Sequence, residues 1–324
     1  MSSRDKILKY IQEKEQATVI ELINEFQLTR AMVQRHLKKL IEEKSVLKRG
    51  SPPRVYYFPS ENKKEFVDVK IEIDQQKRDI IEKNFLYIMP NGEKADGLNG
   101  FRIWCDKRDF DISKKAVEYC DIYDKYKQYK ENNLIKGTVK MHKVFNTKCI
   151  NDVFYSEFYA WEIFGKTKIG QLVMYSKQSQ DRKMIKKVVE MIKDDVLSII
   201  KKENIQAIGF APPSIDRKIQ FMRILQDELN IALPVINIVK VHGEIVVPQK
   251  TLSKIDDRIK NAKETMVVDD KGEYDNILII DDAVGSGATL EQLACKCKRN
   301  NVAQNVFGYA IVGSVKGFDV ISEI

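Results

Sequence analysis

Residues Ile277–Thr289 read ILIIDDAVGSGAT, and the architecture of the chain can be worked out from this stretch. Its first four residues are apolar and predict a buried strand near the centre of a sheet. Two carboxylates, Asp281 and Asp282, follow at the carboxyl end of that strand, and a glycine-containing loop leads into a helix expected over 289–298. Because loop N–H groups and a helix N-terminus attract anions, the stretch predicts a binding site for a phosphate group.

The side chains of the same stretch favour a ribose phosphate as the ligand. Glycines at 285 and 287 permit a sharp turn and a close approach of the ligand, and Ser286 and Thr289 add hydroxyl donors. Adjacent carboxylates accept hydrogen bonds from two vicinal hydroxyls, as a ribose offers, and they can also hold Mg²⁺. The loop is neither a Walker A loop nor a GxGxxG dinucleotide loop. The alternative is an acidic strand end with a glycine-rich turn that serves structure only.

The sequence around this stretch alternates helices and strands from about residue 165. The expected elements are a helix over 183–202, a strand over 205–210, a helix over 217–230, and strands over 233–241 and 305–312. Such alternation predicts an α/β fold with a doubly wound parallel sheet. In sheets of this kind the ligands bind at the carboxyl ends of the strands.

Four hydrophobic residues, two acids and a small-residue loop that closes on threonine resemble the phosphoribosyl pyrophosphate (PRPP) motif of type I phosphoribosyltransferases. Gly285 stands where that family usually has threonine, and Ala283 where it has a larger aliphatic residue. The resemblance implies the type I phosphoribosyltransferase fold, Mg²⁺ held by Asp281 and Asp282, and PRPP or another ribose phosphate bound along the loop. The implied binding residues are Asp281, Asp282, Ala283, Val284, Gly285, Ser286, Gly287, Ala288 and Thr289.

A second segment, Pro248–Met266, resembles the Q..L…R..N segment of ComF-like phosphoribosyltransferases, with one extra residue before the arginine. The resemblance implies a mobile catalytic loop, a preceding loop that receives pyrophosphate, and a lysine at position 177 before the first long helix of the domain. The residues implied for pyrophosphate and for the catalytic loop are Ala211, Pro212, Pro213, Ser214, Lys240, Gln249, Arg258 and Asn261. The alternative for Arg258 and Asn261 is an exposed, charged helix. The CxxC zinc element of the ComF-like family is missing here.

The first sixty residues predict three short helices and a hairpin: helices over 3–14, 18–26 and 29–43, then strands on either side of a Gly/Pro turn at 49–53. This order resembles a winged helix-turn-helix, in which the third helix enters the major groove and the wing contacts the backbone. The resemblance implies a DNA or other nucleic-acid partner bound through Arg30, Gln34, Arg35, Lys38, Lys39, Arg49 and Arg54. The alternative is a helical module for protein contact or dimerisation.

Composition is compatible with these interpretations. The 324 residues carry a formal net charge of +8, which suits anionic partners. The charged, helical N-terminus and the lack of a long apolar run predict a cytoplasmic protein with no membrane partner. The odd number of cysteines, five, favours reduced thiols. We expect a winged helix-turn-helix over 1–60, a middle region over 61–160 that forms a hood or bridge, a phosphoribosyltransferase-like domain over 161–324, and a homo-oligomer.

The function expected from the sequence is a phosphoribosyltransferase-like activity that transfers or cleaves a ribosyl C1 bond with Mg²⁺. In this class, Mg²⁺ and a cation such as Lys240 or Arg258 stabilise the leaving pyrophosphate. One alternative is a transcriptional regulator that senses PRPP or a nucleotide without turnover, because purine repressors of Gram-positive bacteria have a similar domain order. A weaker alternative is a nucleotide-targeting effector of a toxin or antiphage system. The tyrosines of residues 119–129 form a stripe whose expected role is packing rather than nucleic-acid stacking.

Overall fold

The computed structural model describes residues 1–60, 73–145, 147–213, 215, 217–241, 243–245, 247 and 251–314. Two of the expected site residues, Ser214 and Gln249, lie outside these ranges. The chain divides into two compact units, Met1–Ile71 and Glu72–Ile324.

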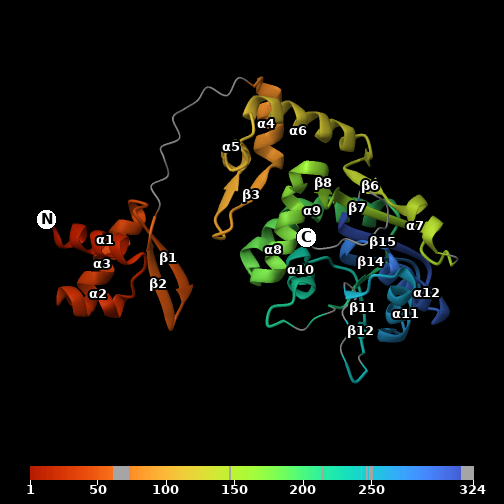
Figure 1. Ribbon diagram of the computed structural model, residues 1–324. Helices are drawn as coiled ribbons and strands as arrows, with labels where there is room; N and C mark the ends of the chain where they lie inside the picture. The colour runs from red at the N-terminus through yellow and green to blue at the C-terminus, as the bar shows by residue number, and fades with distance from the viewer. Residues whose placement is uncertain are drawn as a thin grey trace. The chain divides into compact units, whose positions relative to one another are not determined.

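Three helices and a hairpin make up the first unit (Figure 1). They are α1 (Ser3–Lys14), α2 (Val19–Phe26), α3 (Arg30–Glu42), β1 (Val46–Ser51) and β2 (Arg54–Pro59). The side chains of Ser2, Thr18 and Thr29 cap the three helices by accepting backbone N–H bonds. The apolar faces meet in one core, whose buried members include Ile7, Ile11, Leu22, Val33, Leu37, Leu40, Val46 and Tyr57. This arrangement agrees with the winged helix-turn-helix expected from the sequence.

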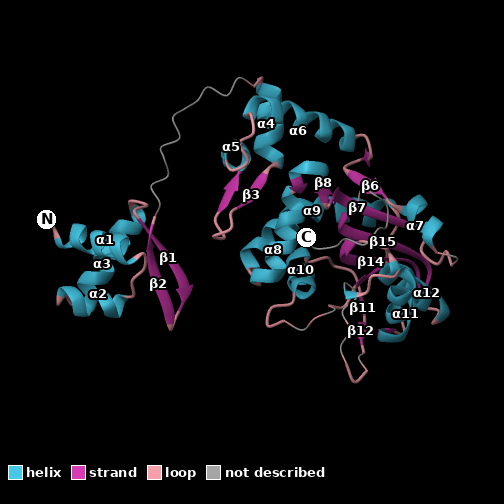
Figure 2. Cartoon of the chain, in the orientation of Figure 1, coloured by secondary structure: helices cyan, strands magenta, loops and turns pink. Residues whose placement is uncertain are grey.

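A seven-stranded sheet forms the centre of the second unit, in the order β11-β10-β14-β15-β7-β6-β5 (Figure 2). Its strands are β5 (Lys130–Glu131), β6 (Leu134–Lys136), β7 (Asp152–Phe158), β10 (Ala207–Phe210), β11 (Val235–Ile236), β14 (Tyr274–Val284) and β15 (Ala303–Gly313). Strands from β11 to β7 pair in parallel, and β6 and β5 pair antiparallel. The expectation of an α/β fold with a mostly parallel sheet is therefore confirmed.

Helices cover both faces of this sheet, and the apolar run 277–280 is buried for that reason. The helices are α4 (Gln75–Asn84), α5 (Gly97–Asp106), α6 (Ile112–Lys127), α7 (Thr138–Val144), α8 (Lys168–Ser179), α9 (Arg182–Lys202), α10 (Phe221–Leu229), α11 (Ile255–Thr265) and α12 (Ala288–Arg299). Leu278 and Ile280 belong to a core shared with α8, α9 and α10. Ile277 and Ile279 belong to a second core, which includes α11 and α12. Alternate residues of β14 thus point to opposite faces, as the pleat requires.

The middle region continues the sheet rather than forming a separate part. The pairing of β7 with β15 joins Asp152–Phe158 to the last described strand, and β6 pairs with β7. The boundary expected near residue 160 therefore differs from the structure, because the strands before it complete the sheet. Two short β-hairpins lie outside the seven-stranded sheet. One pairs β3 (Leu86–Ile88) with β4 (Lys94–Asp96). The other pairs β8 (Ala160–Trp161) with β9 (Gly165–Lys166), and a 3-10 helix at Glu162–Phe164 joins its strands.

The tyrosines of α6 pack as expected. Tyr119 and Tyr126 are buried, and their rings contact Trp161. Tyr123 also contacts Trp161, whereas Tyr129, just beyond the helix, is exposed. These aromatic contacts hold α6 against β8 and leave little of the tyrosine stripe exposed to bind nucleic acid.

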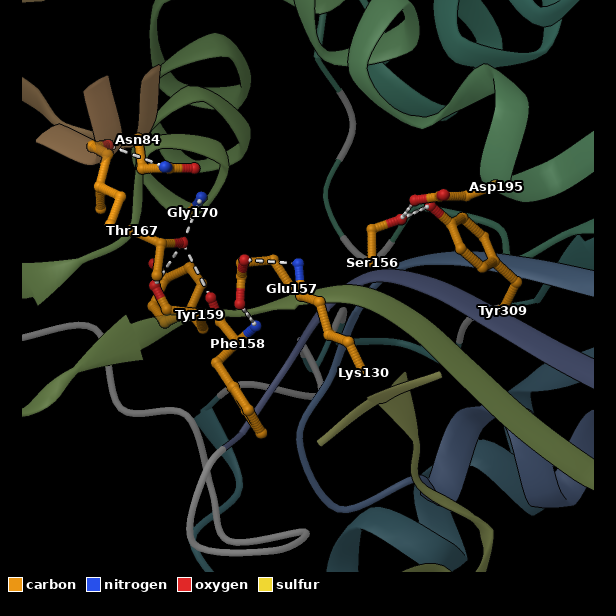
Figure 3. A network of polar contacts seen from close by, with 11 residues as sticks. Asn84, Lys130, Ser156, Glu157, Phe158, Tyr159, Thr167, Gly170, Asp195 and Tyr309 are labelled. Atoms are coloured by element: carbon orange, nitrogen blue, oxygen red, sulfur yellow. Dashed lines mark hydrogen bonds and ion pairs between the residues drawn. The ribbon is translucent and has the colours of Figure 1, made fainter. Parts of the chain in front are cut away.

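A buried polar group ties the longest helix to the sheet (Figure 3). The hydroxyl of Ser156 on β7 donates to a carboxylate oxygen of Asp195 on α9 over 2.5 Å. The same hydroxyl lies 2.6 Å from the phenol oxygen of the fully buried Tyr309 on β15. Burial raises the pKa of Asp195 above its ordinary value. Since three elements meet in this one group, it fixes the register of α9 over β7 and β15.

Between β10 and α11, two elements differ from the expected ranges. The strand expected over 233–241 is split into β11 and β12 (Ile238–Lys240), which pairs antiparallel with β13 (Met266–Val268). The split falls at Asn237, whose side chain and backbone are hydrogen-bonded to Asp269 and Asp270 instead of to the sheet. The helix expected from 217 begins only at Phe221, because the side chain of Arg217 and the backbone N–H of Ile219 donate hydrogen bonds to Lys177 and Gln180 at the end of α8.

Candidate functional site

The site lies where the connections of the parallel sheet diverge. β10 and β14 are neighbours, with Phe210 paired to Ile280. The chain leaves β10 through α10 toward β11 on one side, and leaves β14 through α12 toward β15 on the other. Such a topological switch point opens a crevice at the carboxyl ends of the two strands, which is where open α/β sheets bind ligands.

A pocket of about 530 Å³ occupies this position. Its walls are described residues that follow β10 (211–213, 215, 217 and 220–222), residues 281–290 from the end of β14 to the start of α12, and one side of α8. Every residue of the PRPP-like stretch from Asp281 to Thr289 lines it. Its volume is in the range of small-molecule sites, so the pocket has room for a nucleotide-sized ligand.

Two carboxylates stand at the floor of this pocket. The backbone N–H of Asp282 donates to a carboxylate oxygen of Asp281 over 2.7 Å. Burial, and then the neighbouring charge of Asp282, raise the pKa of Asp281 to about 7. Lys177 on α8 counteracts this effect, since its Nζ lies 2.7 Å from Oδ2 of Asp282. The pair is therefore a concentrated negative charge with one cation already in contact.

Beyond the carboxylates, β14 runs on to Val284, and α12 begins at Ala288, one residue before the expected start. Gly287 is the N-cap, with φ of +79° in the left-handed region that glycine adopts without strain. The hydroxyl of the buried Ser286 accepts a hydrogen bond from the N–H of Ala288. The remaining N–H groups of a first helical turn have no partner inside the helix, so this turn offers donors to an anion at the pocket.

The residues expected for pyrophosphate are only partly assembled. Ala211, Pro212, Pro213 and Arg258 line the pocket. Arg258 lies on α11 and is 7% exposed; its Nε donates to the carbonyl of Leu252 over 2.7 Å, and burial lowers its pKa. The charged-helix alternative for Arg258 does not hold, because the side chain is buried.

Lys240 and Asn261 are not among the described residues that line the pocket. The expected position of Lys240 beside the ligand is therefore not found. Its ammonium nitrogen is buried, has no hydrogen-bond partner among the described residues, and has a pKa lowered by burial. Asn261 donates through its amide to the carbonyl of Val247 over 3.5 Å.

Some pocket residues were not expected from the sequence. Arg217 lines the pocket and donates to the backbone carbonyl of Lys177. Tyr159, which follows β7, and Gln178 on α8 also line it. No local pattern marks these residues, because they come from elements far from the PRPP-like stretch in the sequence.

The cysteines differ from the expectation of reduced thiols. Cys149 and Cys295 form a disulfide across 146 positions of the chain. Each sulfur lies within 4.8 Å of a carboxylate oxygen of Glu291. Cys105, Cys120 and Cys297 are free and buried. The pairing could not be read from the spacing, because it depends on how the chain folds back before β7.

The residues expected to contact nucleic acid lie on the surface of the first unit. Arg30, Gln34, Arg35, Lys38 and Lys39 are exposed on α3. Arg35, Lys38 and Lys39 lie on the face away from the buried Val33, Leu37 and Leu40, and Arg30 and Gln34 lie beside that face. Arg54 is exposed at the start of β2, and Arg49 is partly exposed on β1. The helix and the hairpin thus present cations on the faces that the core leaves free.

Comparison with known proteins identifies one part of the chain. Residues 2–43 match the family model of bacterial regulatory proteins of the arsR family. These residues span the three helices of the first unit, so the match supports a DNA-binding winged helix-turn-helix there. The chain matches no curated protein. Among the described residues, no helix is both long enough and apolar enough to cross a membrane.

Proposed function

We propose that this protein binds DNA through its first unit and binds a ribose 5-phosphate ligand, PRPP or a nucleotide, in the pocket of its second unit. We further propose that it transfers or cleaves the ribosyl C1 bond of that ligand with Mg²⁺. The observation that carries the proposal is the placement of Asp281 and Asp282 between Lys177 and the N-terminus of α12, in one pocket at the switch point of the sheet.

The two ends of the pocket loop complement a ribose phosphate. The N–H groups of the first turn of α12 favour a dianionic 5′-phosphate. The carboxylates stand at the other end of the loop, where vicinal 2′- and 3′-hydroxyls can donate to them. A ligand that spans the loop would satisfy both ends together, which a free phosphate cannot do.

The donor set fits Mg²⁺. Carboxylate oxygens are the protein ligands that Mg²⁺ prefers, and both carboxylates are partly exposed to the pocket. Burial, and then the charge of Asp282, raise the pKa of Asp281, so a cation bound between the two carboxylates would favour their ionised forms. Bound there, Mg²⁺ would neutralise negative charge on the pyrophosphate of the ligand. Asp281 and Asp282 would hold it, directly or through water.

The residues of the chain can also support departure of a group from C1. Arg258 reaches the pocket from α11, so its guanidinium can hold a leaving pyrophosphate or phosphate in two-point contact. Apolar residues of the pocket wall, among them Val173, Phe221 and Val284, would limit the access of water to a ligand in the transfer reaction. The side chains named here orient the ligand and stabilise charge, which is the main task in this chemistry.

A second candidate is a regulator that senses the ligand without turnover. The match of residues 2–43 to arsR-family regulatory proteins favours it. Enzyme and sensor share the same binding step and differ in whether the C1 bond breaks. Release of pyrophosphate from PRPP in the presence of candidate bases would support the enzyme, and binding without release would support the sensor.

Calorimetric titration of PRPP with Mg²⁺ into the full chain tests the binding step. We expect binding by the wild type and a loss of about tenfold or more in the Asp281→Asn/Asp282→Asn variant, because two hydrogen-bonding carboxylates are removed. The matched control is Asp256→Asn/Asp257→Asn, another pair of consecutive aspartates that is exposed on α11 and outside the pocket lining. A wild type that binds neither PRPP nor nucleotides at millimolar concentration would refute the proposal.

A further inference from the structure

The disulfide between Cys149 and Cys295 lies next to the helix that carries the phosphate loop. Cys149 precedes β7 and is partly exposed, whereas Cys295 is buried on α12. We propose that this pair is a thiol–disulfide switch that regulates the pocket: the bond orders the phosphate loop, and its reduction loosens the loop and weakens ligand binding. The effect on ligand rests on the proposed function, whereas the effect on the order of the loop does not.

Glu291 joins the same two segments a second time. It lies on α12, one turn before Cys295, and its side chain is fully buried. One carboxylate oxygen accepts the N–H of Cys149 over 2.8 Å, and the other accepts the N–H of Ile150 over 3.3 Å. The disulfide and the carboxylate therefore hold one short backbone segment against one helix. Breaking the covalent bond leaves only hydrogen bonds as polar ties among the described residues: the two to Glu291, and one from Lys298 on α12 to the side chain of Asn151 over 3.0 Å.

A chain of contacts leads from this segment to the phosphate loop through α7. A ring nitrogen of His142 on α7 lies 3.1 Å from the carbonyl oxygen of Ile150. The neighbouring Met141 packs on the N-cap of α12, because a Cβ placed on Gly287 would lie 2.8 Å from its sulfur. Phe145, directly after α7, also reaches this position, at 3.4 Å. Loosening at residues 149–150 would therefore remove one support of the helix that packs against the loop backbone, while Thr138 still ties the start of α7 to β7.

The chemistry of the other described cysteines confines thiol–disulfide exchange to the pair Cys149 and Cys295. Burial raises the pKa values of Cys105 and Cys297 to about 12 and that of Cys120 to about 11. Thiols of this kind hold almost no thiolate at neutral pH, and the thiolate is the form that exchanges with disulfides. Cys149 is partly exposed, so a thiol reductant can attack its sulfur.

A dithiol such as dithiothreitol supplies the two electrons and two protons that reduction of the disulfide requires. One reductant thiolate attacks the sulfur of Cys149, the bond to Cys295 breaks, and Cys295 takes up a proton. The second reductant thiol then displaces Cys149, which leaves two protein thiols and one cyclic oxidised reductant. Two electrons and two protons pass to the protein, and an oxidised dithiol or peroxide reverses the step.

Hydrogen exchange measured by mass spectrometry, on oxidised and reduced wild type without ligand, tests the switch directly. We expect faster exchange in α7 and in residues 284–292 after reduction, and no change in the first unit. Alkylation of the freed thiols would confirm that Cys149 and Cys295 were reduced. Equal exchange in the two states would overturn the proposal, whether or not PRPP binds.

Titration of PRPP with Mg²⁺ into the same two samples measures the consequence for the pocket. We expect affinity to fall about fivefold or more on reduction, the lower end of ordinary coupling between sites. Cys149→Ser should reproduce the reduced state under oxidising conditions, and its PRPP affinity should no longer respond to reductant. Cys297→Ala is the control, since this buried thiol lies on the same helix; it should keep the response. A protein that binds no PRPP but still shows the exchange difference would contradict the proposed function and leave the switch standing.

A different role for the pair gives a distinct result. If reduced wild type retains one equivalent of zinc through gel filtration, and Cys149→Ser does not, then the two sulfurs and Glu291 are metal ligands. That outcome would overturn the switch in favour of a metal site.

Discussion

Lys177 contacts Asp282 through a 2.7 Å ion pair, although the two residues are 105 positions apart in the chain. The contact brings α8 to the carboxyl end of β14 and places one cation beside two carboxylates. It means that the charge of the site is partly balanced by the protein itself before any ligand arrives.

Replacement of this lysine should make the pocket dependent on an added cation. We expect Lys177→Met to lower the free energy of unfolding by about 1–2 kcal/mol in EDTA, between the values of exposed and buried pairs. Millimolar Mg²⁺ should restore more stability to the variant than it adds to the wild type, as urea unfolding with and without Mg²⁺ would show. Lys125→Met removes a more exposed partner, that of Glu162, and should cost less and show no Mg²⁺ response. If Mg²⁺ does not raise the free energy of unfolding of Lys177→Met more than that of the wild type, the carboxylates do not bind the metal.

The raised pKa of Asp281 predicts a pH dependence of stability in the absence of Mg²⁺. Its folded pKa of about 7 lies above the ordinary value of 3.8, so the folded state binds a proton that the unfolded state has already released. The contribution of Asp281 to stability is therefore present below pH 3.8 and is lost as the pH rises through about 7. Asp281→Asn should remove this loss, so the variant should gain stability relative to the wild type between those values.

Urea unfolding of both proteins across that pH range checks the sign. Asp282→Asn is the companion variant, because the charge of Asp282 is the second cause of the shift. It should move the window to lower pH without abolishing it. A constant difference between Asp281→Asn and wild type at every pH would contradict the assignment.

Gly287→Ala should damage the phosphate loop in two ways. The positive φ strains any residue with a Cβ, and here the Cβ would also lie 2.8 Å from the sulfur of Met141. We expect a loss of stability of about 1–3 kcal/mol. Gly92→Ala is the matched control, since its φ is also positive, at +83°, but nothing lies within 4 Å of the added carbon. Gly92→Ala should show only the backbone strain, a loss of about 1 kcal/mol in the free energy of unfolding. Equal losses for the two variants in chemical denaturation would mean that Met141 and α7 can move aside at no cost.

The cations of α3 should bind duplex DNA by neutralising its phosphates. We expect Arg35→Ala and Lys38→Ala each to weaken binding, and to reduce the slope of log affinity against log salt by about 0.9 for each phosphate that is no longer neutralised. Lys9→Ala is a close control for Lys38→Ala, because both lysines are exposed and each forms a side-chain pair with a glutamate four residues later. Fluorescence anisotropy over a range of salt concentrations measures both quantities. If Lys9→Ala weakens binding as much as Lys38→Ala does, the groove assignment is wrong.

The sequence predicted those parts of the fold that depend on local pattern. The three short helices of the first sixty residues and the apolar run 277–280 carry their signal within a few residues, and the structure confirms both as elements. The stretch that lines the pocket has a local signal of the same kind, since two carboxylates and two glycines follow the apolar run within seven residues. Its role in ligand binding stays a prediction.

Other features depend on contacts between distant segments and had no local signal. The strand expected over 233–241 is divided because Asn237 hydrogen-bonds to aspartates more than thirty positions away. Lys240, expected beside the ligand, lies on a strand that pairs with β13 instead of extending β11. The disulfide and the pairing of β7 with β15 likewise join residues that are more than a hundred positions apart.

The position of β15 between β14 and β7 has a consequence for the synthesis of this protein. Residues of β7 leave the ribosome about 150 positions ahead of the residues of β15 that they pair with. At the usual rates of translation this interval is on the order of ten seconds or more. During that time the edge of β7 that later pairs with β15 has unpaired backbone N–H and C=O groups. Such an edge can pair with a strand of another chain. The nascent protein therefore has a period of vulnerability to aggregation that ends only when β15 inserts between the two strands.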